Sequence, residues 1–122
     1  MSFNTDVDGQ EPIAVRLTNN SVTTIVDGTI VGGWNVSWVA FGEVGGTTPA
    51  LTLELYDGTT SHYLSADGYC WVGKALTAYQ SVAIDDLVVA KGWKLRATSN
   101  HASGNVHVTG AMARRQSAAP VR

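Results

Sequence analysis

The stretch LTLELYDGTTSHYLS, residues 51–65, is the clearest structural signal in the chain because its pattern is that of a β-hairpin. Successive side chains of a strand point to opposite faces of a sheet, so Leu51, Leu53 and Leu55 share one apolar side. Asp57-Gly58 tolerates the positive φ of a tight turn, and a second polar, β-branched and aromatic run follows it. The stretch therefore predicts two antiparallel strands with one buried face and one polar face.

Strand patterns of this kind recur along the rest of the chain, whereas helical periodicity is nearly absent. Extended runs are expected over residues 13–17, 22–26, 34–44, 70–76, 82–89, 93–99 and 106–113. Parallel neighbours need long crossover connections, and no helical segments are available to form them. The sequence thus predicts an all-β, antiparallel β-sandwich, jelly-roll-like, of about eight strands.

Strict alternation also assigns the aromatic residues of the longest run. Trp34, Val36 and Trp38 fall on one side of the strand over residues 34–44, so we expect these tryptophans in the core. The same argument places Trp93 inward, next to Leu95 and Ala97. The single cysteine, Cys70, is interpreted as a small buried hydrophobe.

Length and composition indicate one globular domain. The chain has 122 residues, of which 44% are hydrophobic and 15% charged, and no apolar run approaches the ~20 residues of a spanning helix. We expect a sandwich domain over residues 12–113, an N-terminal arm over 1–11 and a C-terminal arm over 114–122. The start of the chain lacks a secretion pattern, so synthesis in a cytoplasm is expected. A net charge of -2 gives no general attraction to nucleic acid.

The two predicted arms carry charges of opposite sign. The acidic residues are Asp6, Asp8 and Glu11, and the basic residues are Arg114, Arg115 and Arg122. These side chains are either solvated or pair with the opposite arm of a neighbouring copy. The second alternative makes them candidate interface residues.

Residues that could support chemistry are scattered. His62, His101 and His107 have no second histidine or cysteine at metal-binding spacing, so no metal site and no cofactor are predicted. A G-x-S-x-G elbow and a phosphate-binding loop are missing. Asp85-Asp86 interrupts an apolar stretch and predicts a bend or bulge, where a paired-carboxylate site would form only if the chain bulges. A catalytic triad assembled in space stays open, and the chain is not expected to be an enzyme.

Several aromatic residues are expected at the surface. Tyr56, Tyr63 and Tyr79 are predicted to be exposed and to serve a protein interface or a glycan site, with the interface preferred. Trp71 or Trp93 would join them in a sugar-stacking site.

Four segments carry a resemblance to a known group of proteins. They are TLELYDG (Thr52 to Gly58), SHYLS (Ser61 to Ser65), LVVAKGWKLRATS (Leu87 to Ser99) and NVHVTGAMA (Asn105 to Ala113). From Val22 to Ala113, about three quarters of the chain, their order resembles that of small β-sandwich proteins among the structural genes of tailed bacteriophages and phage-like particles. One departure is Trp93, which stands where that group usually has an acidic residue.

The resemblance implies a virion component without catalytic residues, made in the host bacterial cytoplasm. Such proteins serve as capsid decorations, at the head-tail collar or in the tail, and contact other virion proteins as homo-oligomers. The alternative from another class is a carbohydrate-binding module that recognises host surface glycans through exposed aromatics.

Overall fold

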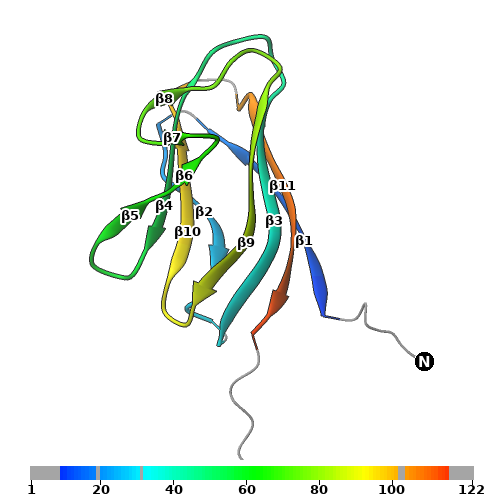
Figure 1. Ribbon diagram of the computed structural model, residues 1–122, viewed down its shortest axis with the longest axis vertical. Coiled ribbons are helices and arrows are strands. Elements are labelled where there is room, and N and C mark those ends of the chain that lie inside the picture. Colours follow the sequence, from blue (N-terminus) through cyan, green and yellow to red (C-terminus); the bar gives the residue numbers. More distant parts are fainter. Residues whose placement is uncertain (1–8, 19, 31, 102–103, 116–122) are drawn as a thin grey trace, which may run out of the picture.

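The computed structural model describes residues 9–18, 20–30, 32–101 and 104–115, which form an antiparallel all-β structure (Figure 1). Its strands are β1 (Gln10–Leu17), β2 (Thr23–Asp27), β3 (Gly33–Glu43), β4 (Ala50–Tyr56), β5 (Ser61–Tyr63), β6 (Ser65–Ala66), β7 (Tyr69–Cys70), β8 (Lys74–Ala75), β9 (Ser81–Ala90), β10 (Lys94–Ser99) and β11 (Val106–Arg114). Eight of these strands have three residues or more. The predicted fold class is therefore confirmed, although the continuous strand expected over residues 70–76 is replaced by two short pieces.

The order of the strands is that of a jelly roll. One sheet runs β1-β11-β3-β9, and the other runs β2-β10-β4-β5 with β8 also paired to β4. Among the eight longer strands, the first pairs with the last, the second with the seventh, the third with the sixth and the fourth with the fifth. This nesting is what a single long hairpin produces when it is wrapped into two layers. The 51–65 hairpin, β4 and β5, is its innermost turn.

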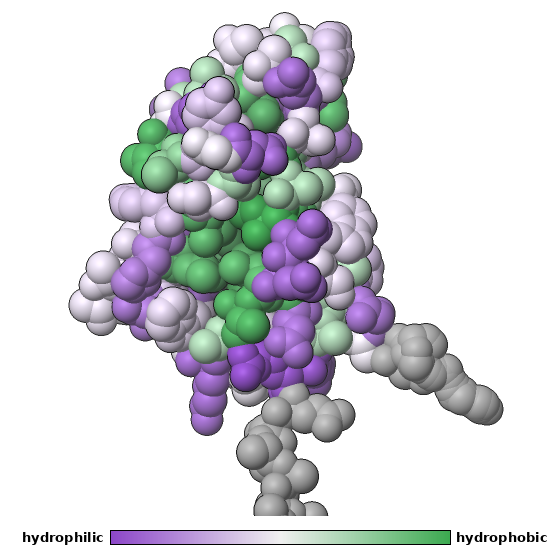
Figure 2. Space-filling view, viewed as in Figure 1, coloured by the Kyte–Doolittle hydropathy of each residue, from purple (hydrophilic) through white to green (hydrophobic). Residues whose placement is uncertain are grey.

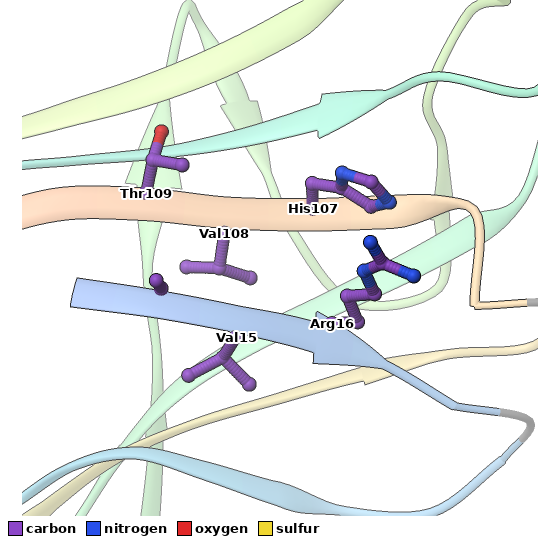
Figure 3. Close-up of a pocket in the computed structure, with 6 residues that line it drawn as sticks. Val15, Arg16, His107, Val108 and Thr109 are labelled. Atoms are coloured by element: carbon purple, nitrogen blue, oxygen red, sulfur yellow. The ribbon is translucent and has the colours of Figure 1, made fainter.

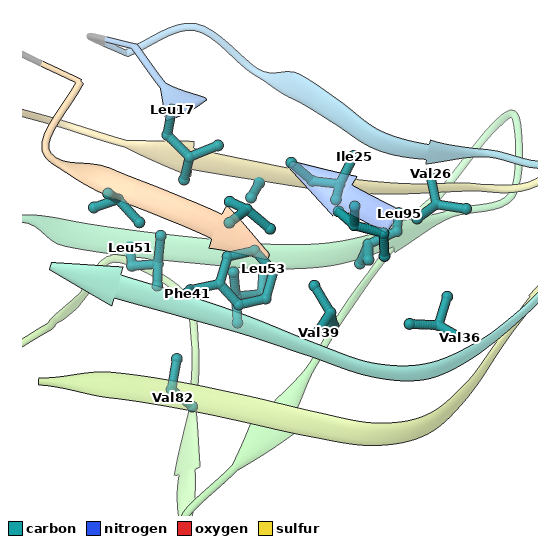
Figure 4. Packing of buried hydrophobic residues seen from close by; sticks show 14 of the residues in the cluster. Leu17, Ile25, Val26, Val36, Val39, Phe41, Leu51, Leu53, Val82 and Leu95 are labelled. Atoms are coloured by element: carbon teal, nitrogen blue, oxygen red, sulfur yellow. The ribbon is translucent and has the colours of Figure 1, made fainter. Parts of the chain in front are cut away.

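The core lies between the two sheets, whose inner faces carry aliphatic and aromatic side chains (Figure 4). Leu51 and Leu53 of β4 are fully buried there, as predicted, whereas Leu55, next to the turn of the hairpin, is only partly buried. Phe41 of β3 faces them from the other sheet and is also fully buried. Val108 of β11 is fully buried as well.

A β-bulge reverses the expected faces in β3. Val36 pairs with Met112 of β11, but Trp38 pairs with the adjacent Ala111, so Ser37 is one extra residue in β3. Beyond Ser37 the alternation is inverted, and Trp38 points away from the core with 41% of its surface exposed. The prediction that Trp38 is a core residue is therefore wrong, because alternation holds only while the register is unbroken.

The neighbouring strands accommodate this bulge. In β9, Asp86 lies at the same level as Ser37 and has a φ of 55°, so the irregularity predicted at Asp85-Asp86 is present. In β11, Gly110 faces inward beside the bulge, where a Cβ atom would overlap the carbonyl oxygen of Trp38. Glycine is therefore required at this position by close backbone approach.

The long connection from β5 to β9 closes part of the flank of the sandwich. Trp71 and Leu76, each 3% exposed, fill the space beside β4, and the Trp71 indole Nε1 donates a hydrogen bond to the carbonyl oxygen of Ala66 at 3.0 Å. The preceding residue, Cys70, is exposed. The prediction of a buried cysteine is wrong because the inward position of this segment is occupied by Trp71.

Candidate interaction surfaces

The predicted arm residues are only partly described by the structure. Asp6, Asp8 and Arg122 lie outside the described residues. Glu11 belongs to β1 and Arg114 to β11, and their side chains form an exposed ion pair at 3.7 Å within one chain. These two strands pair from Gln10 opposite Ala113 to Leu17 opposite Val106, which brings the oppositely charged segments together. Arg115 follows β11 at an exposed position.

The three predicted tyrosines do not form one cluster. Tyr56 and Tyr63 lie on the outer face of the five-stranded sheet, on paired strands β4 and β5. Tyr63 is exposed, whereas the Tyr56 ring is covered by the Arg96 guanidinium, 3.8 Å from the ring centroid. Tyr79 lies apart from them in the connection before β9 and is 74% exposed.

The outer face of the five-stranded sheet, which we call the polar face, pairs Arg96 with Glu54 within the chain. Arg96 Nε donates to the Glu54 carboxylate at 2.6 Å, and its Nη2 donates a longer bond, 3.4 Å, to the Ser61 hydroxyl. The same guanidinium stacks on Tyr56. Glu54 is consequently held as a paired group although its residue is buried.

The outer face of the four-stranded sheet, which we call the Trp38 face, is built differently. Trp38 lies in a cross-strand row with Pro12, Ala111 and Asp85. The other outward positions nearby are mostly small: Ala14, Thr109, Ala40 and Ala83 in the next row, and Gly42 and Ser81 in the row beyond. An antiparallel sheet that faces water normally carries polar side chains on its outer face. Sequence alternation missed this face because it assigned Trp38 to the core.

Arg16 and His107 mark one corner of the Trp38 face. They are register partners on β1 and β11 and point to the same side of the sheet, opposite to Val15 (Figure 3). A shallow depression of about 180 Å³ lies between these strands. Within the described part of the chain, Arg16 has no ion-pair partner.

A buried carboxylate orders the loops at one end of the sandwich. Burial alone would raise the pKa of Glu43, but its carboxylate accepts hydrogen bonds from the backbone N–H groups of Tyr79, Thr47, Gly45 and Gly46 and from the Thr47 hydroxyl. These donors lower the pKa of Glu43 to about 2. The Glu43 carboxylate joins the loop after β3 to the loop before β9. The sequence pattern did not predict this role of Glu43.

The histidines lie on separate elements. His62 is half exposed; its Nε2 lies 3.0 Å from an Asp57 carboxylate oxygen, and its ring stacks on Trp93 with centroids 5.5 Å apart. The His62 contact and the backbone N–H groups of Thr60 and Thr59 lower the pKa of Asp57 to about 2. In the described ranges, no three His, Cys, Asp or Glu side chains are grouped to hold a metal ion.

An apolar hollow lies between the β4–β5 hairpin and β9, the edge strands of the two sheets (Figure 2). Partly buried hydrophobic residues on or next to these strands are Leu55, Leu64, Ile84 and Leu87. The core is therefore less completely covered at this part of the flank than at the part closed by Trp71.

Comparisons with known proteins do not identify the chain. No protein-family model matches it, and neither the curated proteins nor the solved structures contain a significant match. The part of the chain that the structure describes includes no helix long and apolar enough to cross a membrane.

Proposed function

We propose that this protein is a non-enzymatic structural subunit of a tailed-phage or phage-like virion, a capsid decoration or head-tail collar protein that acts through homo-oligomeric protein–protein contacts. The observation that carries the proposal is the Trp38 face, a sheet surface with an exposed tryptophan among small residues. The jelly-roll fold is common in viral capsid proteins, which is an argument from analogy and adds to the resemblance of the strand motifs.

The Trp38 face supports a contact function on energetic grounds. A tryptophan buries about 150–250 Å² when it is fully covered, so leaving Trp38 exposed forgoes part of the hydrophobic stabilisation it could provide. Small neighbours also allow another surface to approach the sheet closely. Tryptophan is among the residues that contribute most to binding energy at interfaces.

Three of the groups that could perform chemistry have structural roles, which supports the non-enzymatic part of the proposal. Glu43 is enclosed by backbone donors that organise two loops. Asp57 accepts hydrogen bonds from the backbone of its own turn, and His62 packs against Trp93. Among the described residues, no serine or cysteine hydrogen-bonds to His62.

A carbohydrate-binding function has less support than protein contact. Trp71 is buried and His62 covers one side of Trp93, so neither ring is a free stacking platform. The exposed rings Tyr63 and Tyr79 lie on different parts of the molecule. Within the described structure, the exposed aromatic rings thus do not form one sugar-binding platform.

The test uses cells that carry the gene. Particles released from these cells are purified and analysed by mass spectrometry and by electron microscopy with an antibody against the chain. We expect the chain in multiple copies per particle, and we expect deletion of the gene to reduce particle yield or stability. A chain found only in the soluble cell fraction would contradict the proposal. Binding on a glycan array that is lost with Tyr63→Ala or Trp38→Ala would support the carbohydrate alternative instead.

A further inference from the structure

Two charges of opposite sign lie on the Trp38 face. Arg16 is on edge strand β1, and Asp85 is on the opposite edge strand β9. They are three strand spacings apart, about 14 Å, and the register offsets them by four residues, about 13 Å along the strands. A pair within one chain is therefore out of reach. Neither side chain has an ion-pair partner among the residues that the structure describes.

The surroundings of the two charges make the corners complementary. Asp85 is the register partner of Trp38, so one corner is acidic and aromatic. Arg16 is flanked by His107 on β11 and by Ala14 on its own strand, so the other corner is basic with small neighbours. An arginine can bind a carboxylate and can also stack on an indole ring.

We propose that the Trp38 face is the interface between two copies of this chain, in which the Trp38–Asp85 corner of each copy lies on the Arg16 corner of the other. The inference rests on the proposed function in that it identifies the homo-oligomeric contact. The two copies are related by a two-fold axis that lies in the plane of the interface, midway between the two corners. Each contact between corners therefore occurs twice.

The register determines the main contacts of this arrangement. The rotation that brings Arg16 onto Asp85 of the second copy carries Trp38 to the region of Ala14 and Arg16 of that copy. The strands of the two sheets then cross at nearly a right angle, which is one of the two common ways for sheets to pack. The small residues Ala40, Ala83 and Thr109 lie between the corners and allow the sheets to come together.

The size of the face indicates a modest affinity. Four strands at 4.8 Å spacing and about eight residues at 3.3 Å rise give about 500 Å² of footprint per copy. This value is near the lower limit for specific interfaces. Two isolated copies should therefore associate weakly, and repetition in a larger assembly would strengthen the contact.

A second copy fits this surface better than an unrelated partner does. Each charged corner finds its complement on the same face of an identical chain, so one surface supplies both halves of the interface. The polar face lacks this property, because its Arg96 and Glu54 already pair with each other.

Sedimentation equilibrium of the full chain tests the interface directly. We expect the mass to rise from 12.9 kDa toward twice that value as the concentration increases to about 1 mM. High salt should weaken the association because ion pairs contribute to it. A wild-type chain that remains a single copy over this range overturns the proposal.

Charge exchange tests the geometry. Arg16→Glu and Asp85→Arg should each raise the dissociation constant about tenfold, and the double variant should restore most of the affinity, because both pairs are re-formed with reversed sign. A double variant that associates no better than the single variants overturns this arrangement. Trp38→Ala should raise the dissociation constant at least about thirtyfold.

A matched pair of variants guards against effects on folding. Ala83→Glu adds a charge to the Trp38 face, whereas Thr98→Glu adds the same charge to the polar face. Only Ala83→Glu should abolish association, with the far-UV circular dichroism of both variants unchanged; equal effects of the two variants contradict the proposal. Self-association of a chain that is missing from purified particles refutes the proposed function but leaves this interface intact. A chain that stays monomeric but is present in particles refutes this interface and leaves the proposed function intact.

Discussion

The two outer sheet faces of this sandwich cover the same core but are built from different side chains. On the polar face, Arg96 joins Glu54, Ser61 and Tyr56 in one network, so the charges of Arg96 and Glu54 are satisfied within the chain. On the Trp38 face, one large ring lies among small residues, and Arg16 and Asp85 have no ion-pair partner among the described residues. The comparison shows that two outward faces of one sandwich can differ in polarity and in charge pairing, which strand alternation alone does not predict.

The faces share one hydrophobic core, so the largest effect comes from damaging it. Leu53→Ala should lower the free energy of unfolding by about 2–5 kcal/mol, because Leu53 is fully buried between the sheets. Thr98→Ala, at an outward position of β10, should change it by less than about 0.5 kcal/mol. Urea unfolding of both variants measures the difference. A nearly neutral Leu53→Ala would mean that the inner face has been misassigned.

Two glycines on neighbouring strands compare the two sides of the four-stranded sheet. Gly110 on β11 faces the core, whereas Gly42 on β3 lies on the Trp38 face. Gly110→Ala should cost about 1–3 kcal/mol, since the new methyl group overlaps the carbonyl of Trp38 at the bulge. Gly42→Ala places its methyl group on the open outer side, 3.8 Å from the nearest atom, Ser81 Cβ, and should be tolerated. Thermal unfolding of the two variants distinguishes them. Similar melting temperatures would show that the bulge does not hold the strands this closely.

Removing one arginine from each outer face compares how the two faces hold their charges. Arg96→Met leaves the Glu54 carboxylate buried without its partner and should destabilise the isolated chain by about 1–3 kcal/mol. Arg16→Met removes a charge without a partner in the described structure and should change monomer stability by less than about 0.5 kcal/mol. Both are measured by urea unfolding at low protein concentration. Equal losses would contradict the difference between the faces.

Acid sensitivity should arise at the loops rather than at either face. The pKa of Glu43 is about 2 in the folded chain and 4.5 in a model peptide, so the unfolded state binds its proton at a higher pH. The stability that Glu43 provides is complete above about pH 4.5 and is lost as the pH falls toward 2. Asp57 behaves in the same way between 3.8 and about 2.

Unfolding measured between pH 6 and pH 2 tests this assignment, with Glu43→Gln and Asp57→Asn as separate variants. Each variant should be less stable than the wild type at pH 6 and should show a shallower decline in acid. A decline unchanged in both variants would mean that other carboxylates are responsible. Arg16→Met is the control, and its loss of stability between pH 6 and pH 2 should equal that of the wild type.

The fold was largely predictable because periodicity is a local signal. The apolar positions of β4 and the Asp-Gly turn gave the hairpin directly, and the long runs gave the other main strands. The sequence predicted the class of topology, a jelly-roll-like antiparallel sandwich, but not which strands are neighbours in each sheet. The failures occurred at Ser37 and Cys70, where an extra residue or a competing tryptophan altered which side chain faces inward.

The candidate surface was less predictable than the fold. Tyr63 and Tyr79 were correctly expected at the surface. The Trp38 face, however, depends on a bulge in β3 that the sequence pattern did not predict. The pairing of Glu11 with Arg114 likewise follows from the register between β1 and β11. Such features require the three-dimensional arrangement because they join residues that are distant along the chain.

Thiol labelling tests the difference between the two faces most directly. Single cysteines are introduced as Ala83→Cys on the Trp38 face and Thr98→Cys on the polar face, each in a Cys70→Ser background, and their modification rates are followed as the protein concentration rises. The Ala83→Cys thiol should become protected as copies associate, while the Thr98→Cys thiol should react at a constant rate. Equal protection of both thiols, or protection of the Thr98→Cys thiol alone, would contradict the assignment of the Trp38 face as the contact surface.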